Sequence, residues 1–224
     1  MIQLMTPCLR RPALRGLVPA LVFAVGVVLS GPAFSAQSAQ KTWESCAQKT
    51  AAAERAAGMP SHLLTAVSKV EAGRWRKDTG EILAWPWTVT SGGEGRFLPS
   101  KAAAIAEVER LRAKGVTNID VGCMQINLHY HPKAFDSLEQ AFDPDRNVAY
   151  AVGFLRELRA RWGSWTRAVG NYHSNTPTLS GRYRVKVFKM VYAEKHRIAK
   201  KRRAARLAAV QENLRPPSTT PVIR

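Results

Sequence analysis

The stretch Val121-Gly122-Cys123-Met124-Gln125-Ile126-Asn127 is the most informative part of this chain of 224 residues. Upstream of it, Glu71 ends an apolar segment with helical spacing, and downstream stands Tyr172-His173-Ser174. Taken singly, a glutamate at a helix end is usually a solvated charge, and a Gly-x-Met-Gln string is usually a loop. One acid, one glycine-led loop and one tyrosine-containing turn, in this order, predict a site built around a single carboxylic acid.

The first 35 residues are expected to be a signal peptide and not part of the folded domain. Arg10, Arg11 and Arg15 form a positive region, an apolar run of 14 residues follows from position 16 to 29, and small residues near Ser35 offer a cleavage site. Such a run is too short to span a bilayer comfortably. We therefore expect the mature chain to be exported and to work in the periplasm.

Removal of this segment leaves two cysteines, Cys46 and Cys123. An oxidising compartment permits a disulfide, and two thiols allow a single pairing. That bridge would join an N-terminal helical segment, residues 36–58, to the loop that carries Met124 and Gln125. Two buried thiols that never meet are the alternative, because a sequence gives no Cα separation.

The chain is strongly basic. Its formal net charge is +18, and removing the three signal arginines, with no acid among the removed residues, leaves 18 − 3 = +15. Such a surface attracts polyanions; an exported protein seldom meets nucleic acid, so anionic lipid headgroups or an acidic wall polymer are the expected partners. Residues 193–224 form a basic extension, with seven Lys or Arg and no acid between Lys195 and Arg206. This extension is either a solvated helix or an electrostatic anchor to an anionic surface.

The acid is expected at the end of an amphipathic helix. Pro60 suits the first turn of this helix, Glu71 lies at the edge of its apolar face, and Gly73 is the expected C-cap. The negative end of the helix dipole and the apolar neighbours both disfavour the carboxylate, so the pKa of Glu71 should be raised, as a general acid requires. The apolar face consists of Leu63, Leu64, Val67 and Val70.

The rest of the chain predicts a mostly helical domain with one small β-element. Residues 82–97 have the composition of a β-hairpin, with turn residues at 91–93, and Pro86 restricts its first strand to an edge. Capping residues then delimit four further helices. These helices run from Ser100 to Gly115, from Asp143 to Gly163, from Ser164 toward Tyr172, and from Ser180 or Gly181 onward.

Four segments in order resemble the signature segments of lytic transglycosylases of the soluble-lytic-transglycosylase (SLT) type. The resemblance covers residues 59–192 and implies a lysozyme-like α+β fold, mostly α, with a small β-hairpin insertion. It is greatest to members linked to pilus, flagellum or secretion-system assembly. The four segments are Val70-Glu71-Ala72-Gly73, Gly122-Cys123-Met124-Gln125-Ile126-Asn127, Tyr172-His173-Ser174 and Tyr183-Arg184-Val185-Lys186-Val187.

The resemblance also implies a reaction. Such enzymes cleave the β-1,4 bond between N-acetylmuramic acid and N-acetylglucosamine in peptidoglycan strands and leave 1,6-anhydro ends. Carried over to this chain, Glu71 is the single acid and base, and Tyr183 hydrogen-bonds and orients it. Sugar-binding roles fall to Met124, Gln125, Tyr172 and His173.

Three features depart from the family pattern. Ala72 replaces the serine that usually follows the acid, and His173 replaces an asparagine, which leaves either substrate binding or a structural hydrogen bond as its role. The span between Glu71 and Gly122 is also longer than in compact members. Trp85 and Trp87 in this span serve either core packing or sugar stacking.

Other readings stay open. A second carboxylate between the motifs would make the enzyme a hydrolytic muramidase, and a groove without catalysis would make the chain a cell-wall-binding assembly protein. His129 and His131 lack further ligands at metal-binding spacing, so we expect no metal site and no cofactor. The candidate second carboxylates are Asp78, Glu81, Glu94 and Asp120.

Overall fold

The structure is a computed structural model that describes residues 33–215, with side chains from residue 39 onward. The expected signal peptide lies almost wholly outside the described residues. Within residues 33–215, no helix is both long and apolar enough to cross a membrane. The helices are α1 (Ala33–Ala56), α2 (Leu63–Ala72), α3 (Lys101–Ala113), α4 (Leu138–Ala141), α5 (Pro144–Trp162), α6 (Trp165–His173) and α7 (Pro177–Asn213), and the strands are β1 (Gly73–Arg76), β2 (Glu81–Ala84), β3 (Thr88–Ser91), β4 (Glu94–Phe97), β5 (Ile119–Val121) and β6 (Ile126–Asn127).

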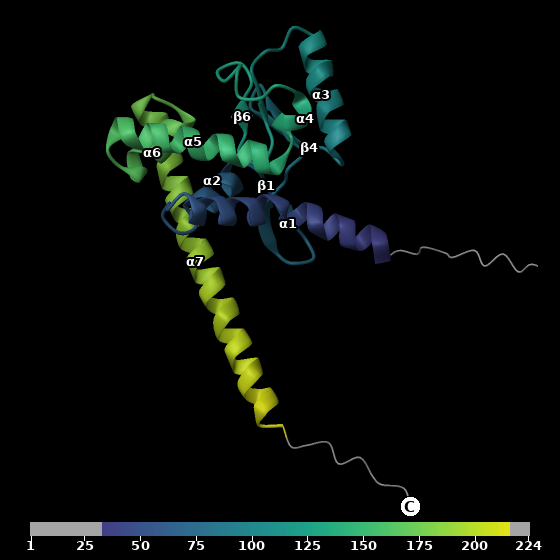
Figure 1. The fold of residues 1–224 in the computed structure, drawn as a ribbon, viewed down its shortest axis with the longest axis vertical. Helices are drawn as coiled ribbons and strands as arrows, with labels where there is room; N and C mark the ends of the chain where they lie inside the picture. Colours follow the sequence, from purple (N-terminus) through teal and green to yellow (C-terminus); the bar gives the residue numbers. More distant parts are fainter. Residues whose placement is uncertain (1–32, 216–224) are drawn as a thin grey trace, which may run out of the picture.

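The described part of the protein contains two hydrophobic cores. The larger core lies among α1, α2, α5, α6 and α7, and Met124 from the β5–β6 loop is part of it. The smaller core lies between the sheet and the helices α3 and α4, with Val89, Val108 and Phe142 among its members. Figure 1 shows α3 and α4 beside the strands, with α5, α6 and α7 on the other side. The expected mostly helical α+β class is confirmed.

The strands form two sheets, which corrects the expected single hairpin. β1 and β2 form a two-stranded antiparallel sheet, and β4-β3-β5-β6 form a second, four-stranded sheet. The turn at Gly92-Gly93 was placed correctly, but residues 82–90 are not one strand. The backbone N–H of Trp85 still follows the β1–β2 register by donating to the Ala72 carbonyl at 2.8 Å, and its indole N–H donates to the Leu98 carbonyl at 2.7 Å. The chain then turns at residues 86–87 and starts the separate strand β3. Pro86 then supplies no ladder donor.

A carboxylate from another helix caps the start of α2. Glu54 of α1 is only 4% exposed, and it accepts hydrogen bonds from the backbone N–H groups of His62 at 2.8 Å and of Leu64 at 3.2 Å. These N–H groups have no partner within a helix, and a negative charge at this end suits the helix dipole. α2 therefore begins at Leu63, after a turn at Pro60, and not at Pro60 as expected.

The local caps of α3, α5 and α6 are as predicted. The side chains of Ser100, Asp143 and Ser164 each accept a hydrogen bond from the backbone N–H three residues further on. Gly163 ends α5 in the left-handed conformation, with φ of 74°. These caps are local, so a single sequence is enough to reveal them.

The last helix is longer than expected at both ends. α7 begins at Pro177, whose fixed φ suits a first helical position, and not at Ser180 or Gly181. It passes the expected boundary between residues 192 and 193 without a break and continues to Asn213. Figure 1 shows its distal half extending away from the rest of the molecule.

A buried ion-pair cluster fastens the middle of α7 to α2 and β2. Lys69 and Glu194 pair with side chains only 3% and 4% exposed. Arg197 also binds Glu194, at 2.7 Å, and Lys201 binds Glu81 of β2 at 2.6 Å. Burial lowers the pKa of Lys69; it acts to raise the pKa of Glu194, but hydrogen bonds from Arg197 and Lys69 lower that pKa overall. The contact between α7 and the body thus reaches as far as Lys201.

We expect Glu194→Gln to destabilise the protein by roughly 3–5 kcal/mol, because the buried ammonium of Lys69 would lose its counter-charge. Glu212→Gln is the matched control, since Glu212 lies on the same helix, is exposed and, among the described residues, pairs only with Arg215. The measurement is urea-induced unfolding of both variants and the parent chain. Equal midpoints for the Glu194 and Glu212 variants would contradict a stabilising role for the cluster.

Candidate active site

Glu71 lies in the last turn of α2, where the chain passes directly into β1. The expected cap Gly73 is in an extended conformation, with φ of −67° and ψ of 122°. A Cβ at this position would lie 2.1 Å from the carbonyl oxygen of Lys69, so only glycine permits this exit from the helix. The side chain of Glu71 is partly exposed, at the junction of α2, α7 and the β5 region.

The surroundings raise the pKa of Glu71 to about 7. Burial is the main cause, because it disfavours the charged form. The donor hydroxyl of Tyr183 and the positive charge of Lys186 lower this pKa, whereas the negative charge of Asp120 raises it. A carboxyl group with this pKa can both give and take a proton near neutral pH.

Tyr183 of α7 is an aromatic neighbour of the acid. It is 4% exposed, and burial together with the Glu71 charge raises its own pKa well above the usual range. Within residues 33–215, its buried hydroxyl meets no acceptor at regular hydrogen-bond geometry. The two groups therefore lie near each other without a well-formed bond, and the expected hydrogen bond from Tyr183 to Glu71 stays a prediction. The ring of His173 stacks on Tyr183 with centroids 4.6 Å apart and an interplanar angle of 6°.

The loop between β5 and β6 is fixed by a buried asparagine. Asn147 of α5 is fully buried; its side-chain amide donates to the carbonyls of Val121 at 3.0 Å and Ala141 at 2.9 Å, and its oxygen accepts from the backbone N–H of Met124 at 2.8 Å. Gly122 has φ of 81°, and a Cβ there would lie 2.5 Å from the Asn147 amide nitrogen. The glycine thus serves both the turn and the close approach of Asn147.

The loop side chains do not point where the sequence suggested. Met124 is fully buried in the larger core, which corrects the expectation that it lines a sugar-binding groove. The amide of Gln125 donates to the carbonyls of Thr88 at 3.1 Å and Gly122 at 3.0 Å, and its oxygen accepts from the hydroxyl of Thr90. Its hydrogen-bonding groups are thus engaged within the protein, with the backbone at a positive φ of 48°. In this structure Gln125 supports the loop.

Tyr172 joins the loop to α6. Its hydroxyl donates to the carbonyl of Met124 at 2.7 Å, and its ring lies against Phe154. Burial, followed by the charges of Glu71 and Asp120, raises the pKa of Tyr172 well above the usual range. The Tyr172 side chain therefore lies close enough to Glu71 for the Glu71 charge to affect its pKa. Because that pKa is high, the hydroxyl stays protonated and acts as a hydrogen-bond donor.

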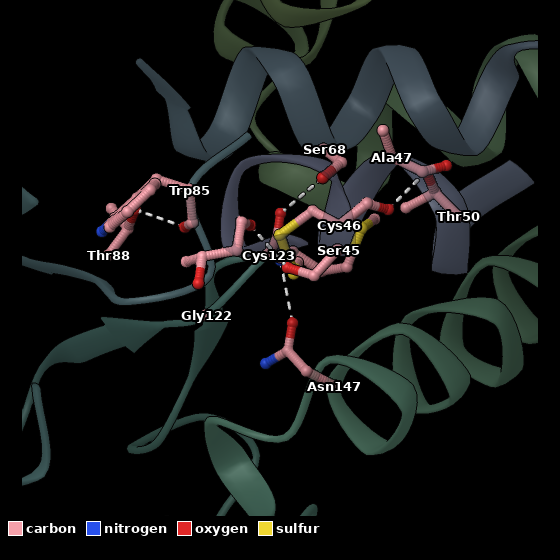
Figure 2. The surroundings of a disulfide bond; sticks show 12 residues. Ser45, Cys46, Ala47, Thr50, Ser68, Trp85, Thr88, Gly122, Cys123 and Asn147 are labelled. Atoms are coloured by element: carbon pink, nitrogen blue, oxygen red, sulfur yellow. Dashed lines mark hydrogen bonds between the residues drawn. A yellow bond between two sulfur atoms is a disulfide. The ribbon is translucent and has the colours of Figure 1, made fainter. Parts of the chain in front are cut away.

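The disulfide between Cys46 and Cys123 is present, and Figure 2 shows its surroundings. It joins α1 to the β5–β6 loop across 77 residues, with a Cα–Cα distance of 5.6 Å. The carbonyl of Cys123 also accepts a hydrogen bond from the hydroxyl of Ser68 in α2, at 2.8 Å (Figure 2). The bridge therefore fixes the loop to α1, and the Ser68 hydrogen bond ties the same loop to α2, the helix that carries Glu71.

Among the four candidate second carboxylates, Asp120 is the one that affects Glu71. Burial raises the pKa of Asp120, against the lowering effect of a hydrogen bond from the Asn127 amide at 2.8 Å. Glu81 belongs to the ion-pair cluster on α7, and Asp78 and Glu94 are exposed. A negative charge beside the acid is thus part of the site.

The remaining candidates have structural partners. Trp85 is 6% exposed and Trp87 packs against the smaller core, so core packing is the use that the structure shows for both. His131 shares a hydrogen bond of 2.8 Å with the Tyr150 hydroxyl. In the part of the chain that the structure describes, no group of three His, Cys, Asp or Glu is placed to hold a metal ion.

Sequence reasoning missed Asn147, Ser68 and Glu54. Asn147 stands one residue before Val148 on the inward face of α5, and an amide at a core position was the available signal. Ser68 and Glu54 gave no signal, because their partners are 55 and 8 to 11 residues away in sequence.

Glu71→Gln should stabilise the protein more at pH 8 than at pH 5. Folding raises the pKa of Glu71 from 4.5 to about 7, so ionisation of this side chain destabilises the folded state. This cost grows as the pH rises from 4.5 to about 7 and stays constant above that pH. The amide removes that cost, so the gain is roughly 2–3 kcal/mol at most above pH 7 and small near pH 5. Thermal unfolding at both pH values is the measurement, with Glu139→Gln, an exposed glutamate, as control. A gain independent of pH would refute the raised pKa.

No curated protein and no solved structure matched the chain. Residues 89–183 match the family model described as the Transglycosylase SLT domain. The match includes the β5–β6 loop, Tyr172 and Tyr183, and begins after Glu71. The resemblance to SLT-type lytic transglycosylases is thereby confirmed over this range: residues 89–183 form an SLT transglycosylase domain, and the mostly helical α+β architecture is consistent with a lysozyme-like fold.

Proposed function

We propose that the chain is an exported peptidoglycan lytic transglycosylase in which Glu71 is the single acid and base. The SLT domain supports transglycosylase action on peptidoglycan in general. The observation that carries the finer proposal is the pKa of about 7 at a partly buried glutamate beside Tyr183 and Asp120. Perturbed carboxyl groups of this kind concentrate at catalytic sites.

The proposed reaction needs one proton carrier. Protonated Glu71 gives its proton to the glycosidic oxygen, the C1–O bond breaks, and N-acetylglucosamine leaves as the alcohol. The Glu71 carboxylate then removes the proton from the C6 hydroxyl of the muramic residue, and O6 bonds to C1. Glu71 ends protonated, no water is consumed, and the product carries a 1,6-anhydro ring.

A tethered nucleophile explains why one carboxylate suffices. Ordinary glycosidases use a second carboxylate to attack the sugar or to activate water. The C6 hydroxyl belongs to the same sugar as the reacting carbon, so an intramolecular attack replaces a bimolecular encounter. In this reading, Asp120 has an electrostatic role: its negative charge raises the pKa of Glu71 and favours a positively charged transition state.

Hydrolysis is the second candidate, and the observation that favours it is that the charge of Asp120 acts on the pKa of Glu71. As the second carboxylate, Asp120 would activate water and the products would have reducing ends. The retained Glu71 speaks against a cell-wall-binding protein without catalysis. Ala72 and His173 are the departures from the family pattern that speak for such a protein.

Export to the periplasm is part of the proposal. A signal peptide over residues 1–35 is expected from the sequence, and the Cys46–Cys123 disulfide suits an oxidising compartment. From the resemblance, we expect the enzyme to act during assembly of a pilus, a flagellum or a secretion apparatus. Peptidoglycan strands are the substrate that the SLT domain implies.

The products of peptidoglycan digestion test the reaction. We expect mass spectrometry of the released fragments to find anhydro-muramic ends, and Glu71→Gln to reduce release by roughly 10²–10⁴-fold through loss of the proton carrier. Asp120→Asn should retain anhydro ends at a lower rate. If the parent chain released fragments with reducing ends and Asp120→Asn did not, the reaction would be hydrolysis. If the parent chain released no fragments, the chain would be a cell-wall-binding protein without catalysis.

The pH dependence of the rate tests the role of Tyr183. Activity should fall as pH rises through about 7, because the first step requires protonated Glu71. Tyr183→Phe removes a donor that lowers the pKa of Glu71, so the alkaline limb should move to higher pH. Asp120→Asn removes a charge that raises this pKa, so the same limb should move to lower pH. The measurement is kcat/KM as a function of pH. If the alkaline limb moved in neither variant, that limb would not report the ionisation of Glu71.

A further inference from the structure

One face of α7 remains uncovered along most of the helix. The apolar residues on this face form two groups, within each of which they recur at intervals of three or four positions, and they are 37–77% exposed. The residues that α7 buries against the body, Tyr183, Val187, Val191 and Glu194, lie on the opposite face. The exposed apolar residues are Val185, Phe188 and Tyr192 in the proximal half, and Leu207, Val210 and Leu214 in the distal half. We call this set the outward face.

Unpaired cations fill the gap between the two apolar groups. Of the seven Lys and Arg between residues 195 and 206, Arg197 and Lys201 bind Glu194 and Glu81 on the body side. The others are exposed and, in the part of the chain that the structure describes, make no ion pair with a carboxylate. These five are Lys195, Lys200, Arg202, Arg203 and Arg206.

Three of the five free cations lie on the outward face. By helical spacing, Arg203 lies in line with Tyr192 and Val210, with Lys200 and Arg206 on its two flanks, whereas Lys195 and Arg202 lie at the edge of the face. Along α7 the outward face therefore has an apolar part, then a basic part and then a second apolar part. From Val185 to Leu214 these parts extend over roughly 45 Å, at about 1.5 Å a residue. Figure 1 shows that the distal half of α7 projects clear of the other elements.

Charge decides which occupant suits this face. A second copy would bring the cations of this face against like charges, which is unfavourable. An acidic wall polymer would satisfy the cations, but it is polar and offers nothing to Leu207, Val210 and Leu214. An anionic bilayer surface offers phosphates to the cations and an apolar boundary to the aliphatic and aromatic side chains, along one plane that a straight helix can follow.

We propose that the outward face of α7 binds the surface of a membrane containing anionic lipids, with the helix lying in the plane of the interface. Tyr192 suits the headgroup level, where an apolar ring and a polar hydroxyl are both accommodated. The helix rests on the bilayer and does not cross it. The proposal is independent of the catalytic mechanism.

The test is co-sedimentation of the processed chain, as the cell produces it, with lipid vesicles. We expect binding to vesicles of phosphatidylglycerol and phosphatidylcholine, weakening as salt increases, and little binding to phosphatidylcholine alone. Arg202, Arg203 and Arg206→Gln should reduce the partition coefficient by roughly tenfold to a hundredfold. Leu207, Val210 and Leu214→Gln should also reduce it by several-fold at least, without a change in net charge.

The matched control removes three exposed cations elsewhere, by Arg112, Lys114 and Lys133→Gln. This variant should bind vesicles nearly as well as the parent chain, and all variants should digest purified peptidoglycan at the parent rate. An equal loss in the control would show that net charge alone is responsible and would overturn the proposal. Variants that lose binding to purified peptidoglycan but keep vesicle binding would assign the face to the wall polymer instead.

Discussion

The position of α2 is set by two buried carboxylates that belong to other helices. Glu54 of α1 caps its first turn, and Glu194 of α7 neutralises Lys69, two residues before Glu71. Each carboxylate is buried, so each must keep its partner: an unpaired charge in this environment is far more costly than the pair. The helix that carries the acid is therefore held at its start by α1 and near its end by α7.

The same arrangement explains the pKa of Glu71. A helix fixed between two others brings its last turn into a region with little water, where a carboxylate is disfavoured. Tyr183, from α7, and Asp120, from β5, then act on this pKa in opposite directions. The pKa of the acid therefore depends on elements from both sides of the molecule, and the disulfide fixes the loop that follows β5 to α1.

Local chemistry was predictable from the sequence, and long-range pairing was not. Ser100, Asp143 and Ser164 cap their helices through bonds to residues three positions away, so a short window contains the whole interaction. The division of residues 82–90 into two strands depends on their partners, because β2 pairs with β1 whereas β3 pairs with β4 and β5, and no window around residues 82–90 contains β1 or β5. The β-element was therefore recognised by composition but divided wrongly.

At the candidate site, too, local features were predictable from the sequence and side-chain directions were not. Glu71 and the loop from Gly122 to Asn127 were recognised as ordered segments. The raised pKa of Glu71 was expected from the helix dipole and from apolar neighbours, and burial is its main cause in the structure. Where Met124 and Gln125 point was not predictable, because the side chains of an irregular loop follow no periodicity. Met124 fills the core, and the Gln125 amide is used by neighbouring backbone and by Thr90.

Gly122 and Asn147 fit together so closely that neither can change alone. Any side chain at position 122 would occupy the space of the Asn147 amide, and any smaller residue at position 147 would leave the Met124 N–H and two carbonyls without partners. Divergence at these two sites must therefore pass through a poorly folding single replacement or occur as a simultaneous exchange. Among descendants of this protein, the two positions should be inherited as one unit.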